Sequence, residues 1–315
     1  VVPPAPTDDV VALPDGRPRL AVRTLPGERR PFLLVHGLSS NARLWDGVAR
    51  HLAAAGPRVV AVGQRGPGRS QAPDDGYDTD TCADDLAALV DVLGLTGEAA
   101  PVVVGQSWGG NVVLSLAARH PGSAAAVACV DGGWIRLRDR FASFEECWAA
   151  LAPPQFEGMR YDDLAARIRS MRPDWPAEGL EGTLANLERL PDGGVRPWLS
   201  REHHREIVRS LFEGDPGAWY PRVGVPVLLV PATGGEPADG DDERTAGARA
   251  AVLDALAHLP DGAVRWYPGA DHDIHAEQPE SLAADLLTLA GRVPEATHPA
   301  ATDPAAPTTA QEARS

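Results

Sequence analysis

The sequence contains no lysine, so arginine supplies all 29 of its permanently cationic side chains. The 44 aspartates and glutamates outnumber them and leave a formal net charge of −15. Proteins bind nucleic acids and anionic membranes mainly through excess positive charge. The acidic balance therefore argues against both kinds of partner, and we expect a small-molecule partner instead.

Cysteine is also scarce. The three cysteines, Cys82, Cys129 and Cys147, have no metal-ligand spacing and cannot all pair with one another. Cys129 stands in an apolar run, which is typical of a small core residue. No apolar run approaches the ~20 residues needed to span a bilayer, and the N-terminus lacks the charged-then-apolar pattern of a signal peptide. These features predict a reduced, cytoplasmic protein and leave secretion open.

The 315 residues are enough for one large core, since a domain of about 300 residues buries about three quarters of its unfolded surface. Apolar strand patterns alternate with amphipathic helix patterns along most of the chain. We expect a hairpin over 9–25, buried strands at 31–35, 58–62, 101–104, 124–130, 225–231 and 264–267, and helices at 44–53, 81–93, 112–117 and 282–289. The alternation predicts an α/β fold with a mostly parallel central sheet and helices on both faces.

The alternation breaks between residues 134 and 222. This segment lacks a convincing buried strand and holds five of the eight tryptophans, Trp134, Trp148, Trp175, Trp198 and Trp219. We interpret it as a helical cap over the carboxyl end of the sheet, where open α/β sheets bind ligands. The predicted organisation is a flexible N-terminus (1–8), a core in two parts (9–133 and 223–292) around the cap (134–222), and a disordered tail (293–315).

The stretch Gly105-Gln106-Ser107-Trp108-Gly109 matches the pattern G-x-S-x-G between a predicted strand and a predicted helix. This context is typical of a nucleophile elbow, a sharp turn that exposes the serine hydroxyl above the sheet. Side chains at positions 105 and 109 would collide with the neighbouring strand or helix, which explains glycine at both. Ser107 is therefore the candidate nucleophile.

Four motifs in order resemble the α/β-hydrolase fold superfamily, in its capped, esterase-like serine-hydrolase branch, over roughly residues 10–290. They are His36-Gly37, Arg65-Gly66-x-Gly68-x-Ser70, the Ser107 elbow, and Gly269-Ala270-Asp271-His272 followed by Glu277-Gln278-Pro279. The resemblance implies a serine–histidine–acid triad and says almost nothing about the substrate. One departure is Gly63, which stands where many relatives carry an aspartate before Arg-Gly. We therefore expect a different anchor for the loop of Arg65.

The resemblance places the catalytic histidine in the loop after the last strand, where His272 lies, with His275 as the less favoured alternative. A serine hydroxyl needs such a base within hydrogen-bond reach to act as a nucleophile. The oxyanion hole is expected from the backbone N–H groups of Leu38 and Trp108. His36 is expected to hydrogen-bond the loop backbone, and Trp134 and His36 are the candidate pocket residues.

The acid is less obvious. Most relatives take it from the loop after the strand that follows the cap, but no carboxylate stands directly after 225–231. Glu236 and Asp239 come later in that loop. Asp131 ends the strand after the elbow helix, where some branches of the superfamily place their acid. We favour Asp131, which would hold the ring of His272 in the productive tautomer, with Glu236 and Asp239 as alternatives.

These residues predict a serine hydrolase that cleaves a small carboxylic ester, lactone or thioester through an acyl-enzyme, without a metal or organic cofactor. A hydrolase of C–C bonds beside a carbonyl is the first alternative, and the stretch His36–Asn41 would suit that branch. A non-catalytic binding protein of the same fold is the second, although it would have no chemical reason to keep Ser107 and His272. The substrate and the oligomeric state stay open.

Overall fold

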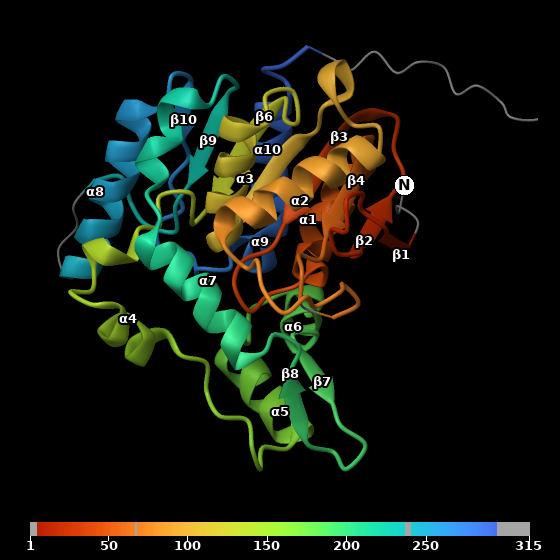
Figure 1. Ribbon diagram of the computed structural model, residues 1–315, viewed down its shortest axis with the longest axis vertical. Helices are drawn as coiled ribbons and strands as arrows, with labels where there is room; N and C mark the ends of the chain where they lie inside the picture. The colour runs from red at the N-terminus through yellow and green to blue at the C-terminus, as the bar shows by residue number, and fades with distance from the viewer. Residues whose placement is uncertain (1–4, 67, 237–240, 295–315) are drawn as a thin grey trace, which may run out of the picture.

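A computed structural model describes residues 5–66, 68–236 and 241–294. Its centre is an eight-stranded sheet in the order β1-β2-β4-β3-β5-β6-β9-β10, in which the pairings β1–β2 and β2–β4 are antiparallel and the others parallel. Helices lie on both sides of the sheet, and a further group of elements gathers at one end of it (Figure 1). The predicted α/β fold with a mostly parallel sheet is confirmed.

The strands of this sheet are β1 (Thr7–Val11), β2 (Leu20–Leu25), β3 (Arg29–Val35), β4 (Pro57–Val62), β5 (Val102–Gln106), β6 (Ala126–Val130), β9 (Val227–Val230) and β10 (Gly262–Val264). The α-helices are α1 (Asp46–Ala54), α2 (Thr79–Val92), α3 (Trp108–Arg119), α4 (Phe144–Leu151), α5 (Tyr161–Met171), α6 (Ala177–Leu184), α7 (Arg201–Glu213), α8 (Glu243–His258), α9 (Ile274–Glu277) and α10 (Pro279–Ala290). Short 3₁₀ helices are η1 (Ala42–Trp45), η2 (Gly97–Ala99), η3 (Leu137–Asp139), η4 (Pro216–Ala218) and η5 (Tyr220–Arg222). None of the described helices has both the length and the apolar character that crossing a bilayer requires.

The sheet is apolar on both faces because successive residues of a strand point to opposite sides. On one face, Val103 and Val127 belong to a buried cluster with residues of α2, α3 and α8. On the other, Val104 and Ala128 belong to a second cluster with residues of α1 and α10. Burial on both faces explains why the central strands read as continuous apolar runs.

The last strand lies earlier than expected. Strand β10 covers 262–264 rather than 264–267, and its register places Gly262 opposite Val227 of β9. Beyond it, the N–H groups of Arg265 and Tyr267 still donate to carbonyls at the end of β9, at 2.8 and 2.9 Å. The expected range was based on the apolar residues of this stretch. The regular hydrogen-bonded ladder with β9 begins earlier, soon after the end of α8.

The first strand begins inside the segment that was expected to be flexible. Strand β1 starts at Thr7, which pairs with Thr24 of β2 in a regular antiparallel ladder. The last two residues of the segment 1–8, which was expected to be flexible, therefore belong to a regular strand. Residues 1–4 and 295–315, and with them nearly all of the predicted tail, lie outside the described residues.

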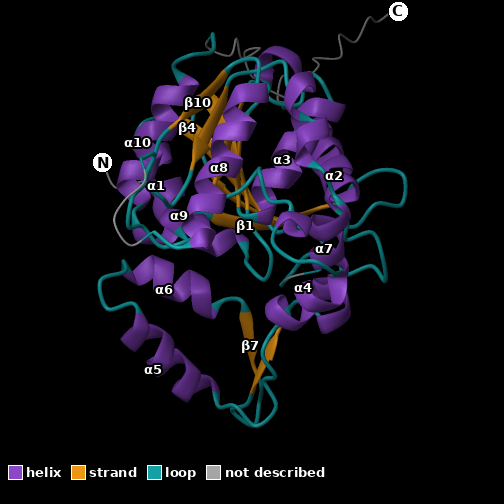
Figure 2. Ribbon diagram, turned by 90° about the vertical axis from the view of Figure 1, so that its left-hand side faces the viewer, coloured by secondary structure: helices purple, strands orange, loops and turns teal. Residues whose placement is uncertain are grey.

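The elements between β6 and β9 lie together beyond one end of the sheet (Figures 1 and 2). We refer to residues 134–222 as the cap. Besides its helices, the cap contains a hairpin of β7 (Leu187–Arg189) and β8 (Val195–Pro197). This hairpin was not expected from the sequence, because three-residue strands are too short to produce a recognisable period.

Polar contacts join the cap to the loop after β3. Asn41 Nδ2 donates to the carbonyl oxygen of Gly182 at 2.9 Å, and Ser39 Oγ lies 2.9 Å from Nδ1 of His204 in α7. Helix α6 approaches the core closely, since a Cβ atom on Gly182 would lie 2.8 Å from Cα of Leu44. The cap therefore contacts a loop that leaves the carboxyl end of the sheet.

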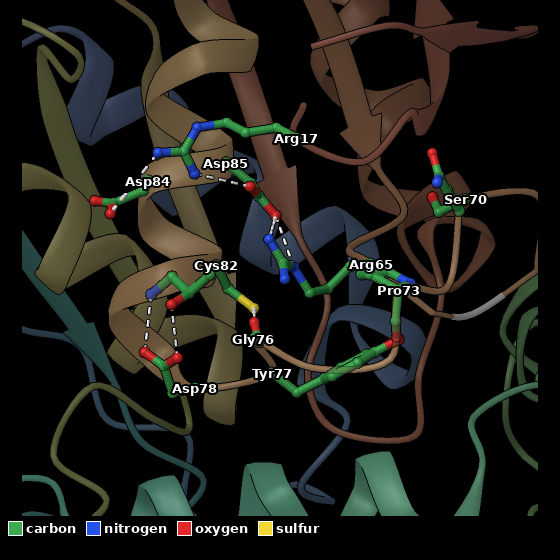
Figure 3. Close-up of polar contacts among 12 residues, drawn as sticks. Arg17, Arg65, Ser70, Pro73, Gly76, Tyr77, Asp78, Cys82, Asp84 and Asp85 are labelled. Carbon is green, nitrogen blue, oxygen red and sulfur yellow. Dashed lines mark hydrogen bonds and ion pairs between the residues drawn. The ribbon is translucent and has the colours of Figure 1, made fainter. Parts of the chain in front are cut away.

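A buried ion pair anchors the loop after β4, where Gly63 replaces the aspartate of many relatives. Arg65 donates from Nε and Nη2 to Oδ2 of Asp85 in α2, at 2.8 and 2.6 Å, and Arg17 donates to Oδ1 of the same carboxylate at 3.1 Å (Figure 3). The side chains of Arg65 and Asp85 are only 6% and 3% exposed. Burial raises the pKa of Asp85, although both arginines oppose that shift. Asp85 is therefore the residue that anchors the loop of Arg65 in this chain, in which position 63 is a glycine.

Removal of the Asp85 carboxylate should destabilise the protein, because the buried charge of Arg65 would lose its partner. We expect Asp85→Ala to lower the free energy of unfolding by about 3–5 kcal/mol in urea unfolding experiments. Asp162 provides the matched control, since its ion pair with Arg189 is exposed. Asp162→Ala should change the same free energy by less than about 1 kcal/mol. Small effects of equal size in both variants would show that the buried pair does not anchor the loop.

Candidate active site

Ser107 sits in a sharp turn between β5 and α3, as the G-x-S-x-G pattern predicted. Its backbone has φ 53° and ψ −125°, a conformation that residues other than glycine rarely adopt. A Cβ atom on Gly105 would lie 2.1 Å from the carbonyl oxygen of Gly109, and one on Gly109 would lie 2.6 Å from that of His36. Glycine is therefore required at both positions, and the turn presents Ser107 at the carboxyl end of β5.

Asp131 follows β6 directly and also has a positive φ, of 42°. One carboxylate oxygen, Oδ1, accepts the N–H of Ala232 at 3.0 Å, and the other, Oδ2, lies 2.6 Å from Nδ1 of His272. The next residue, Gly132, passes so close to the elbow that a Cβ atom on it would lie 2.0 Å from the carbonyl oxygen of Ser107. The strand ends of β5 and β6 thus bring Asp131 beside the elbow and against His272.

The loop after β10 carries His272 back toward the elbow. Gln106, the residue before Ser107, donates from Nε2 to the carbonyl oxygen of His272 and to Oδ1 of Asp273, each at 3.3 Å. The preceding Asp271 forms an ion pair with Arg172 of the cap. The loop is therefore tied on one side to the nucleophile strand and on the other side to the cap.

The neighbours of His272 set its protonation. Burial lowers the pKa of His272, but the hydrogen bond to Asp131 and the charge of that carboxylate raise it, and the pKa lies above its ordinary value. Because Nδ1–H donates its hydrogen bond to the carboxylate, Nε2 of the neutral ring is left as the nitrogen that can accept a proton. This is the arrangement that a general base needs.

The other two histidines near this edge are buried and differ from His272 in their contacts. His275 has no exposed surface, its ring lies 4.5 Å from that of Trp45, and burial lowers its pKa to about 3. His36 is also buried; its Nδ1 lies 2.8 Å from the carbonyl oxygen of Gly37, and its Nε2 accepts the N–H of Gln64 at 3.0 Å. The expected backbone role of His36 is confirmed, and both nitrogens are occupied by it.

The two expected donors of an oxyanion hole come from different elements: Trp108 from the start of α3 and Leu38 from the loop after β3. Trp108 is the first residue of α3, and the N–H groups of a first helical turn have no partner within the helix. Leu38 belongs to the loop after β3, and a Cβ atom on the adjacent Gly37 would lie 2.9 Å from Cβ of Ser107. The loop therefore lies against the nucleophile, and the role of both N–H groups stays a prediction.

The remaining candidates have different outcomes. Glu236 is exposed, and Asp239 lies outside the described residues. Trp134 is 9% exposed and packs in the core cluster on the α3 side of the sheet, so its place in a pocket stays a prediction. His36 has only 1% of its surface exposed, which leaves almost no area for contact with a substrate.

Across residues 5–66, 68–236 and 241–294, no group of three His, Cys, Asp or Glu side chains could hold a metal ion.

Sequence reasoning assigned no role to Arg172 and His204, two cap residues whose side chains contact the loops of the site. Neither belongs to a motif, and their partners, Asp271 and Ser39, are 99 and 165 positions away. Only the folded cap brings these pairs together, and no local pattern carries that information.

Known proteins resemble the chain over most of its length. Residues 30–190 match the sequence model of the alpha/beta hydrolase fold family. The non-heme haloperoxidase of Rhodococcus erythropolis is 27% identical over 273 residues, which cover 84% of this chain and 93% of that protein. The bifunctional esterase/perhydrolase of Acinetobacter calcoaceticus is 27% identical over 265 residues, which cover 81% and 89%. The crystal structure of E-2-(acetamidomethylene)succinate hydrolase superposes with a TM-score of 0.71 at 25% identity and covers 91% of this chain and 99% of that one.

The pKa of His272 should report its partner directly. In Asp131→Asn the hydrogen bond to a charged group and the negative charge disappear, while burial remains. The charges of Asp271 and Asp273 still raise the pKa of His272 in this variant, so we expect the pKa to fall relative to the native protein, and a titration followed by NMR of the imidazole signals would measure the change. Glu236→Gln is the control and should leave the pKa unchanged. A shift in the control, or none in Asp131→Asn, would assign the partner of His272 elsewhere.

Proposed function

Because the chain belongs to the alpha/beta hydrolase fold family, we propose that it is a serine hydrolase that cleaves a small-molecule carboxylic ester, lactone or thioester through an acyl-enzyme. The chain is a hydrolase of this family. The A. calcoaceticus relative is an esterase and perhydrolase, and the superposed structure is a hydrolase of E-2-(acetamidomethylene)succinate. Both support a carbonyl substrate for this chain.

In the proposed reaction, Oγ of Ser107 attacks the substrate carbonyl carbon while Nε2 of His272 takes the hydroxyl proton. Asp131 holds the imidazole in the required tautomer and stabilises the imidazolium that forms. The N–H groups of Leu38 and Trp108 stabilise the negative oxygen, and each such donor typically lowers the barrier by about 3 kcal/mol. His272 then gives the proton to the leaving group, and a water molecule activated by the same nitrogen releases the acid and restores Ser107.

The proposal depends most on the 2.6 Å contact between His272 Nδ1 and Asp131 Oδ2. The two residues are 141 positions apart, and both reach the edge of the sheet at which Ser107 is held in a strained turn. An ion pair that served only stability could lie anywhere on the surface. A carboxylate that orients an imidazole, at the sheet edge that also carries a positive-φ serine, supports the proposed assignment of these three residues.

A fluorophosphonate probe tests whether the serine is activated. We expect the native protein to be labelled, Ser107→Ala to stay unlabelled, and heat-denatured protein to lose its reactivity. Asp131→Asn keeps the nucleophile but disturbs the tautomer of His272, so its rate of labelling should fall by about 10³–10⁴-fold. The measurement is the pseudo-first-order rate of labelling followed by mass spectrometry.

Labelling that persists in heat-denatured protein would indicate chance reactivity of an exposed hydroxyl. Absence of labelling in the native protein would favour the non-catalytic binding protein. Either result would contradict the proposed mechanism.

Cleavage of a C–C bond beside a carbonyl is the second candidate, favoured by the stretch His36–Asn41 after β3. The same three residues could serve that reaction. We expect p-nitrophenyl esters of short acids to be hydrolysed with a higher kcat/KM than vinylogous diketones, measured in one spectrophotometric panel with Ser107→Ala as the blank. The reverse order would assign the C–C bond reaction to this site.

A further inference from the structure

We propose that His204, in cap helix α7, is a positioning residue that holds Ser39 and, through it, the backbone of Leu38 in the conformation that the oxyanion hole needs. The inference rests on the proposed serine hydrolase function, which assigns the N–H of Leu38 to the negative oxygen. It concerns a cap residue for which the sequence analysis found no role.

Ser39 is one of four described residues other than glycine that have a positive φ, with a value of 54°. Two of the others are Ser107 and Asp131, and the fourth is Asp15 in the hairpin turn. Backbone strain of this kind persists only where the surroundings fix it. The N–H of Leu38 belongs to the peptide unit between Gly37 and Leu38, and a fixed Ser39 holds the chain immediately after Leu38 in place.

The group that fixes Ser39 is the ring of His204. Nδ1 of His204 lies 2.9 Å from Ser39 Oγ, and Nε2 lies 3.0 Å from the carbonyl oxygen of Leu151. A carbonyl can only accept, so Nε2 carries the proton and Nδ1 accepts the hydroxyl proton of Ser39. Burial lowers the pKa of His204, which keeps the ring neutral and preserves this pattern.

The ring itself is held in place. His204 is 6% exposed, and the indole of Trp148 meets it edge-on with ring centroids 5.9 Å apart. Together with Leu151, these contacts connect helices α4 and α7 of the cap to the loop after β3. Two other polar links between the cap and this loop run from Asn41 to Gly182 and to Asn186; they lie two residues further along the chain and do not involve Ser39.

An isosteric pair of variants separates the hydrogen bond from simple packing. Asparagine and leucine have the same number of side-chain heavy atoms, and both would remove the contact with Leu151. Only asparagine can place an acceptor where Nδ1 stands. We expect His204→Leu to lower kcat for a p-nitrophenyl ester by about 10–10²-fold, part of the loss seen when an oxyanion donor is removed. KM should change by less than about threefold, since the interaction develops in the transition state. His204→Asn should recover most of the lost kcat.

Ser39 supplies the second arm of the experiment. Ser39→Ala should resemble His204→Leu, and the double variant should be no slower than either single one, because all three remove the same bond. Ser39→Gly should be faster than Ser39→Ala, because glycine adopts a positive φ without strain. His203→Phe is the control on the same helix: His203 stacks on Tyr77, with centroids 3.9 Å apart, and its exchange should leave kcat unchanged.

Three outcomes would overturn the inference: equal loss in His204→Asn and His204→Leu, losses that multiply in the double variant, or a rise in KM at unchanged kcat. The labelling rate with the fluorophosphonate probe provides a second readout that needs no substrate, and urea unfolding verifies that each variant is folded under the assay conditions. Failure of the proposed function shows separately, as native protein that is not labelled or Ser107→Ala that still turns over the ester.

Discussion

The proposed chemistry depends on one hydrogen bond, from His272 to Asp131, and that bond depends on the order of the strands. Strands β5, β6, β9 and β10 are neighbours in the sheet, and all four run parallel. Their carboxyl ends therefore lie along one edge. The loop after β10 must cross the end of β9 to bring His272 to Asp131. Gln106, at the end of β5, holds that loop by a hydrogen bond to the carbonyl oxygen of His272. The sheet, rather than any single loop, determines which side chains can meet.

The same geometry explains why the acid can stand after β6 in this chain. Strands β6 and β9 pair in register up to Val130 and Val230, so residues 131 and 231 leave the sheet side by side. Both positions therefore lie at the same edge of the sheet. Here the loop after β9 contributes a backbone donor instead, the N–H of Ala232 on Asp131 Oδ1. The arrangement requires a positive φ at Asp131 and a glycine immediately after it, because the chain passes against the backbone of Ser107.

The parts that could be predicted from sequence are those with a local signature. Buried parallel strands are continuous apolar runs, and the elbow needs glycines within two residues of Ser107, so both were recognised. Asp131 could be preferred only from its place at a strand end. The anchor of Arg65 was foreseen as different, but Asp85 lies 20 positions away on a helix and carries no motif. The partners of Ser39 and Asp271 were not predicted at all, because the path of the cap depends on packing between distant segments.

These cap contacts change how the cap should be understood. A cap that served only as a lid could pack against the core through apolar side chains alone. This cap instead makes polar contacts with Ser39, beside the expected oxyanion donor, and with Asp271, beside the expected base. The sequence of the cap therefore affects the backbone of the loops beneath it as well as the packing of the cap itself. In the proposed mechanism, changes at these cap contacts would alter the reaction rate, because the loops carry the expected oxyanion donor and the expected base.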